Sequence, residues 1–178
     1  MEEFKSFPAI PRLSREIIVT EKIDGTNGQI FITEHGDVFA GSRTRYITPA
    51  NDNFGFASFV EGNKEELRKL GPGRHFGEWW GKGIQRGYGL KEKRFSLFNL
   101  KKWSDESVRP ACCGIVPVLY RGPFDTTVIE YVLENLRLNG SVAAPGFMQP
   151  EGIVIYHTAG NLLFKKTIEK DEKGKGDE

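Results

Sequence analysis

The residues best suited to chemistry lie in one short stretch, Glu21-Lys22-Ile23-Asp24-Gly25-Thr26-Asn27-Gly28. A lysine amine is a nucleophile only after it loses its proton, and a free lysine has a pKa of about 10.4. Burial and neighbouring positive charge both favour the unprotonated amine. Lys22 follows an apolar, β-branched run at 17–20, so we expect a strand to hold it beside a tight turn at Asp24-Gly25. The stretch predicts a lysine nucleophile on rigid backbone, although a solvated lysine at a strand end would look the same.

Arginine and glutamate residues elsewhere in the chain are suited to binding a phosphorylated ligand. Arg43 and Arg45 follow a predicted strand, and guanidinium groups make paired contacts to phosphate. Glu78 lies between aromatic residues, where its carboxylate needs a hydrogen-bonding partner. Glu151 precedes an apolar strand, which is a suitable position for a Mg²⁺ ligand. Solvated strand ends, an exposed strand acid and a turn acid are the alternative interpretations.

Two further runs carry aromatic or basic side chains on predicted strands. Phe95-Ser96-Leu97-Phe98 alternates with period two, so one of its rings could stack on a base, or both could pack in the core. Lys165 and Lys166 are adjacent near the end of another strand. Because side chains alternate along a strand, only one of these lysines can face a common site.

The elements that position these residues are mostly strands. We predict strands at residues 15–23, 28–34, 38–43, 74–80, 94–100 and 115–120, the last weakened by Pro117 and so at an edge. A hairpin pairs 152–156 with 162–168. Helices are predicted at 54–70, interrupted at Gly62-Asn63, and at 125–138, capped by Asp125. The sequence therefore predicts an α+β fold with antiparallel-rich sheets and packed helices.

Composition limits the class of protein. The chain has 178 residues with a formal net charge of +1, so nucleic acid would have to bind a local basic face. We expect one domain at 1–168 and a charged, flexible tail at 169–178. No leader or membrane-spanning run is present, and Cys112 and Cys113 are adjacent, so we expect a reduced, cytoplasmic protein with no membrane partner.

The order of these clusters resembles the covalent nucleotidyltransferase superfamily of DNA ligases, RNA ligases and capping enzymes. That superfamily runs from Lys-x-Asp-Gly through an arginine, an acid-bearing strand and an aromatic strand to a Glu-Gly strand and a lysine strand. Glu-Lys-Ile-Asp-Gly-Thr-Asn, Ser-Arg-Thr-Arg and Phe-Gly-Glu-Trp-Trp-Gly-Lys-Gly-Ile-Gln most resemble the RNA ligase 2-like family. The resemblance implies an adenylation domain of the DNA ligase type, similar to the ATP-grasp fold.

The resemblance also implies a reaction. Lys22 would attack the α-phosphate of ATP and hold AMP through a phosphoramide bond, with Glu151 helping to hold Mg²⁺ or Mn²⁺. AMP would pass to a 5′-phosphate end of nicked or broken RNA, and a 3′-hydroxyl would then seal the strand. Asp24 and Gly25 complete the nucleophile motif. The residues implied to bind the nucleotide are Glu21, Asn27, Arg43, Glu78, Phe98, Lys165 and Lys166.

Within that set, the resemblance implies different contacts for different residues. Arg43 would contact phosphate, Glu78 the ribose hydroxyls, and Phe98 would stack on adenine. Asn27 would support the ribose or metal-bound water. Lys165 or Lys166 would neutralise the α-phosphate.

Three features depart from the family pattern or leave the choice of substrate open. The family's last motif usually separates two lysines by one residue, whereas Lys165 and Lys166 are adjacent. The Asp24 position is shared with DNA ligases and capping enzymes, so it does not choose the nucleic acid. The chain ends soon after the last motif, so we expect no C-terminal accessory domain. A DNA ligase, a GTP-using capping-type enzyme and a catalytically silent nucleic-acid-binding module remain the alternatives, and the sequence predicts no particular protein partner.

Overall fold

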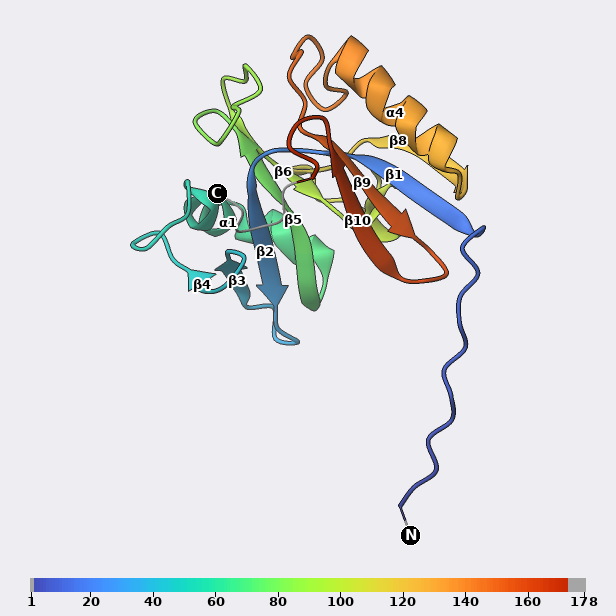
Figure 1. The fold of residues 1–178 in the computed structure, drawn as a ribbon. Coiled ribbons are helices and arrows are strands. Elements are labelled where there is room, and N and C mark those ends of the chain that lie inside the picture. Colours follow the sequence, from blue (N-terminus) through green and yellow to red (C-terminus); the bar gives the residue numbers. More distant parts are fainter. Residues whose placement is uncertain (1, 173–178) are drawn as a thin grey trace.

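The computed structural model describes residues 2–172 and contains two sheets that lie side by side, each covered by helices on one face (Figure 1). The first sheet has four strands in the order β10-β9-β1-β8, and every neighbouring pair is antiparallel. Its strands are β1 (Glu16–Lys22), β8 (Val118–Pro123), β9 (Gly152–His157) and β10 (Leu162–Thr167). Helix α4 (Thr126–Asn139) packs on this sheet.

Alternation along β1 decides which side chains reach α4. Ile17 and Val19 are fully buried and pack against α4 residues such as Val132. Asp125 caps α4, because its carboxylate accepts from the backbone N–H groups of Thr127 and Val128. The opposite face of β1 is left for the side chain of Lys22.

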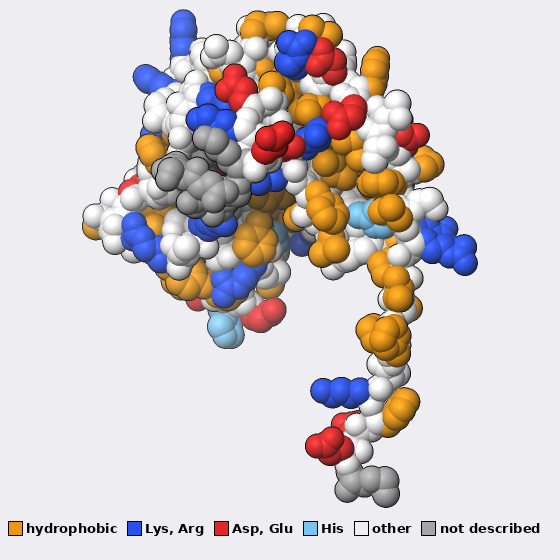
Figure 2. Space-filling view, viewed as in Figure 1, with side chains coloured by type: hydrophobic (Ala, Val, Ile, Leu, Met, Phe, Trp, Pro, Cys, Tyr) orange, Lys and Arg blue, Asp and Glu red, His pale blue; other side chains and the backbone are white. Residues whose placement is uncertain are grey.

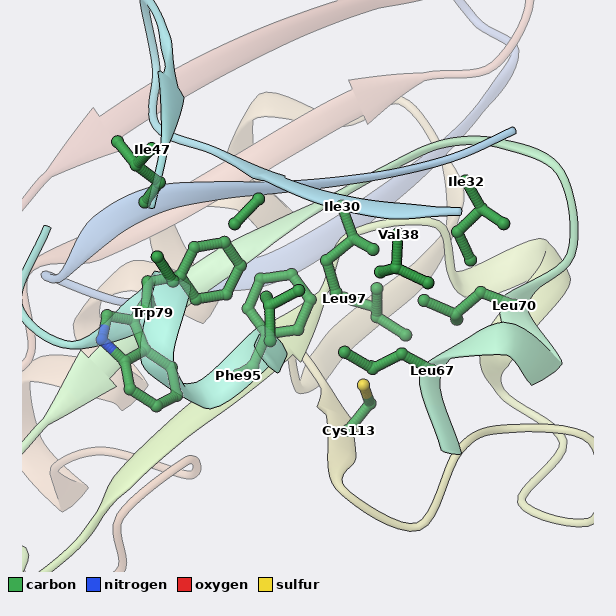
Figure 3. Packing of buried hydrophobic residues seen from close by; sticks show 14 of the residues in the cluster. Ile30, Ile32, Val38, Ile47, Leu67, Leu70, Trp79, Phe95, Leu97 and Cys113 are labelled. Atoms are coloured by element: carbon green, nitrogen blue, oxygen red, sulfur yellow. The ribbon is translucent and has the colours of Figure 1, made fainter. Parts of the chain in front are cut away.

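The second sheet has six strands in the order β4-β3-β2-β5-β6-β7, and only β6 and β7 are parallel. Its strands are β2 (Thr26–Ile32), β3 (Val38–Gly41), β4 (Tyr46–Ile47), β5 (Gly73–Gly81), β6 (Lys93–Leu97) and β7 (Cys113–Ile115). One face packs on α1 (Phe56–Gly62), α2 (Lys64–Leu67) and η1 (Arg68–Leu70) through the cluster drawn in Figure 3.

A smaller core joins the two sheets where β1 turns into β2. Ile23 from that turn packs with Trp80 at the end of β5 and with Tyr88 from the loop after it. Leu100 from α3 (Leu100–Trp103) belongs to the same cluster. This cluster packs the end of β1 against the second sheet. It therefore fixes the position of Lys22 relative to β5.

The predicted architecture is confirmed, and the structure differs from the prediction only in local detail. The helix at 54–70 is divided at Asn63 into α1 and α2, as the Gly62-Asn63 interruption indicated, and ends in η1. The predicted strand at 115–120 is two edge strands, β7 and β8, because Pro117 lacks the N–H that would continue a ladder. The short elements β4 and α3 were not predicted. In residues 2–172 no helix is both long and apolar enough to cross a membrane.

Candidate active site

Lys22 lies at the end of β1 and forms an ion pair with Glu151, the residue before β9. Its Nζ is 2.6 Å from Glu151 Oε1, and both side chains are largely shielded from solvent. The pairing follows from register, because Lys22 lies opposite Gly152 in the β1–β9 ladder. The Lys22 amine therefore has a carboxylate as its ion-pair partner.

Glu151 also has an oxygen that is free for another ligand. Its Oε2 is buried and, among residues 2–172, has no hydrogen-bond partner. A buried carboxylate oxygen without a partner is costly, and a cation at this position would remove that cost. No cluster of three His, Cys, Asp or Glu side chains that could hold a metal occurs in this part of the chain. Glu151 therefore fits a metal whose other ligands are water and substrate phosphate, as is usual for Mg²⁺.

Glu78 on β5 is a buried carboxyl beside the nucleophile motif. Its Oε1 accepts from the backbone N–H of Gly25 at 3.1 Å, and its Oε2 accepts from the Asn27 amide at 3.2 Å. These are the partners that a buried acid required. Burial raises the pKa of Glu78 to about 7, while the nearby charge of Lys22 acts in the opposite direction.

Gly25 allows the motif turn to lie directly on β5. A Cβ at this position would meet the carbonyl oxygen of Trp79 and would lie 2.8 Å from the Trp80 Cβ. Any side chain would therefore push the turn away from β5 and lengthen the bond to Glu78. The glycine of the motif is required by this close approach.

Two residues of the loop after β5 hold the motif in place, and the sequence analysis did not identify their contacts. Arg86 Nε donates to Asp24 Oδ2 at 2.9 Å, and its Nη1 donates to the Gln149 carbonyl oxygen. The Tyr88 hydroxyl accepts from the Asp24 backbone N–H at 2.7 Å. Burial raises the pKa of Tyr88, so its hydroxyl stays protonated. Their only sequence signal is a basic and an aromatic residue in a glycine-rich loop.

The side chain of Glu21 points to the other face of β1 from Lys22. It is buried, and its carboxylate accepts from the Ser141 hydroxyl at 2.6 Å and from the backbone N–H groups of Val142 and Ala143 at 2.8 Å. The Glu21 carboxylate is therefore occupied by these donors, and nucleotide binding by Glu21 stays a prediction. Adjacent strand residues face opposite ways, so Glu21 anchors the turn after α4.

Register also separates the two adjacent lysines of β10. Lys165 lies opposite Val154, which lies opposite Thr20, so Lys165 shares the face of β1 that carries Lys22. Lys166 lies opposite Ile153 and pairs with Glu130 of α4 at 3.2 Å. That pair holds the Lys166 side chain on the face covered by α4. The register therefore favours Lys165 over Lys166 as the lysine that faces the nucleotide, and that role stays a prediction.

The remaining predicted residues lie on or beside strands of the six-stranded sheet. Asn27 lies directly opposite Glu78 in the β2–β5 ladder. Phe98 follows β6 and is 42% exposed, whereas Phe95 is buried in the core, so only Phe98 is available to a ligand. Arg43 is exposed in the loop between β3 and β4 and lines a cavity with Gln29. Within residues 2–172, no hydrogen bond or ion pair joins Arg43 to Lys22, so the structure does not bring these two side chains together.

Comparisons with known proteins agree with this fold. A family model described as RNA ligase matches residues 15–169. A variant of the Naegleria gruberi RNA ligase solved with ATP and Mn has a TM-score of 0.69 at 19% identity, covering 88% of this chain and 51% of that chain. Another variant, solved with AMP and Mn, has a TM-score of 0.64 at 20% identity, covering 87% and 50%. The chain thus spans about half the length of these proteins and shares their fold. No curated protein sequence matches it.

Proposed function

The chain belongs to the RNA ligase family, and from this premise we propose that it carries the ATP-dependent adenylation chemistry of an RNA ligase, with Lys22 as the nucleophile. The observation that carries the proposal is the Lys22–Glu151 pair at 2.6 Å beside the buried Glu78. This arrangement brings together a nucleophile and a metal ligand from the four-stranded sheet and a polar group from the six-stranded sheet. The related structures with ATP or AMP and Mn support the choice of nucleotide and metal.

In the proposed first step, Lys22 Nζ bonds to the α-phosphorus of ATP. The bond between that phosphorus and the bridging oxygen breaks, pyrophosphate leaves with the electron pair, and the amine loses its proton. A divalent metal at Glu151, Mg²⁺ or Mn²⁺, would supply charge neutralisation at the phosphate. A cation held by Glu151 would compete with Lys22 for that carboxylate.

The other residues bind and orient the nucleotide. Lys165 lies on the Lys22 face and would stabilise the α-phosphate as negative charge builds. Glu78 would bind the ribose hydroxyls, and its pKa of about 7 allows it to donate as well as accept a hydrogen bond. Phe98 would stack on adenine and Arg43 would contact phosphate. AMP would then pass to the 5′-phosphate of an RNA end, and a 3′-hydroxyl would displace it.

The decisive experiment is self-labelling with α-labelled ATP and Mg²⁺. We expect a protein-linked AMP that is stable to base, labile to acid and lost in Lys22→Ala. Absence of label in the wild-type protein would refute the proposal and favour a silent binding module. Labelling by GTP in place of ATP would favour a capping-type enzyme. Sealing assays on nicked RNA and nicked DNA would then separate an RNA ligase from a DNA ligase.

A further inference from the structure

A second ordered surface lies on the same face of the six-stranded sheet as Asn27 and Glu78. Asn27 and Phe31 are four residues apart on β2 and therefore face the same way, about 13 Å apart along the strand. Phe31 lies opposite Arg74 on β5 and opposite Phe39 on β3. The helices α1 and α2 cover the other face of this sheet, so these side chains are not part of its core.

Phe31, Phe39, Tyr46 and Arg74 form what we call the aromatic–arginine platform. The three rings lie in mutual contact, with centroids 6.2 to 6.5 Å apart. The Arg74 guanidinium stacks 4.5 Å from the Phe31 ring centroid and donates to the Tyr46 hydroxyl at 3.1 Å. Phe39 is nevertheless 47% exposed and Tyr46 52% exposed. The platform is therefore a fixed arrangement of aromatic surface that remains open to solvent.

A basic cavity of about 230 Å³ adjoins the platform. Arg43 and Arg45 line it together with Arg74, and no carboxylate does. Among residues 2–172, none of these three arginines forms an ion pair with an acidic side chain. Basic and hydrophobic side chains lie interspersed at the lower left of Figure 2, where Figure 1 places β2, β3 and β4. The cavity residues are Gln29, Ser42, Arg43, Thr44, Arg45, Tyr46 and Arg74.

Solvent-exposed aromatic rings and arginines without acidic partners are the groups that bind an unpaired polynucleotide. Bases stack on aromatic faces and on guanidinium planes, while phosphates bind arginine, so both parts of the surface gain a partner from one strand. Duplex nucleic acid would satisfy the arginines but would keep its bases stacked on one another and leave the rings uncovered. An acidic protein segment would likewise satisfy only the charges.

We propose that the platform and its cavity bind a single-stranded segment of the RNA substrate, next to the end that is adenylated. This inference rests on the proposed function, because it places the segment about four β2 residues beyond the nucleotide site. The bases would stack on Phe39 and Tyr46. Arg74 would contact both a base and a phosphate and Arg45 a further phosphate, while Arg43 keeps its proposed role at the nucleotide.

Fluorescence anisotropy with a labelled 5′-phosphorylated RNA of about 12 unpaired nucleotides tests this assignment. We expect Phe39→Ala to weaken binding by roughly tenfold without changing its dependence on salt, because it removes stacking and no charge. We expect Arg74→Ala to weaken binding and to make the slope of log affinity against log salt shallower by about 0.7. Phe39→Tyr keeps the ring and should bind as the wild type does.

Two matched variants control for the loss of an aromatic ring or of a positive charge elsewhere. Tyr131→Ala removes an exposed ring from α4, and Arg68→Ala removes a charge on the helix-covered side of the sheet. Circular dichroism checks that each variant is folded. If Phe39→Ala binds as tightly as Tyr131→Ala, or if Phe39→Leu binds as the wild type does, the stacking assignment is wrong. If Phe39→Ala lost as much affinity for blunt duplex RNA as for the unpaired RNA, the assignment would also be wrong.

The test separates this inference from the function on which it rests. Self-labelling of the wild-type protein by ATP needs no RNA, so its failure would refute the adenylation proposal without affecting the anisotropy result. Conversely, normal self-labelling with unchanged RNA binding in Phe39→Ala and Arg74→Ala would retain the adenylation site and remove the platform.

Discussion

The four-stranded and six-stranded sheets each bury one face under helices and leave the other available to the candidate site. The four-stranded sheet contributes charged groups to that site, namely Lys22, Glu151 and Lys165. The six-stranded sheet contributes Glu78, held by the neutral donors of Gly25 and Asn27, and beyond it the platform of exposed rings.

The two sheets are therefore proposed to have different roles, one in the reaction and the other in recognition of the ligand. The groups proposed to react come from one sheet, and the groups proposed to recognise ribose, base and RNA come from the other. The turn between β1 and β2, fixed by Ile23 in the core that joins the sheets, is therefore as important to the site as any charged residue.

The largest expected effect concerns the charged side of this comparison. Glu151→Ala should lower self-labelling by about 10³-fold, because it removes the proposed metal ligand from the α-phosphate. Rates measured over a range of Mg²⁺ and Mn²⁺ concentrations would show whether more metal partly restores labelling. The matched control is Glu130→Ala on α4. Equal labelling by both variants would contradict a metal role for Glu151.

Variants of Glu21 and Lys22 test whether neighbouring residues of β1 have different roles, one in stability and the other in the reaction. Glu21→Ala should lower the free energy of unfolding by about 3 kcal/mol, because the donors of Ser141, Val142 and Ala143 lose their acceptor. That loss corresponds to a fall in Tm of roughly 6–12 °C. Lys22→Ala should abolish labelling with a smaller fall in Tm, because only the one partner of Glu151 is lost. Thermal unfolding measures both effects. Equal losses of stability in the two variants would contradict this division of roles.

Lys165 and Lys166 provide a matched pair on opposite faces of β10. Lys165→Ala should reduce self-labelling by about 10²-fold, since it removes positive charge facing the reacting phosphate. Lys166→Ala removes the same charge from the α4 face, where Glu130 is its partner, so its effect should be much smaller. Labelling rates at saturating ATP distinguish them. A larger loss in Lys166→Ala would show that the register places the wrong lysine at the site.

The smallest expected effect is a pH dependence from Glu78 on the recognition side. Its folded-state pKa of about 7 lies above the usual 4.5, so the folded protein binds more protons than the unfolded chain between those values. The free energy of unfolding should therefore fall by about 2 kcal/mol as pH rises from 4.5 through 7. Urea unfolding at several pH values should show this slope in the wild type and not in Glu78→Gln. Parallel slopes would contradict the raised pKa.

Much of the fold was predictable because local patterns are strong in this chain. The β-branched alternation before Lys22 predicted β1, and Asp125 followed by a periodic apolar run predicted α4. The short β4 and α3 were missed because two and four residues carry too little pattern. The contacts of Arg86 and Tyr88 with Asp24 were missed because they join residues more than sixty positions apart.

The sequence alone was enough to predict that Lys22 ends a strand beside a glycine turn. It also predicted that the side chains of Lys165 and Lys166 point in opposite directions. The tertiary structure was needed to show that Lys165 shares the face of Lys22 and that Glu21 meets the turn after α4. The reason is that alternation sets which residues lie together on a face, whereas the pairing register of β10, β9 and β1 sets which face meets the site.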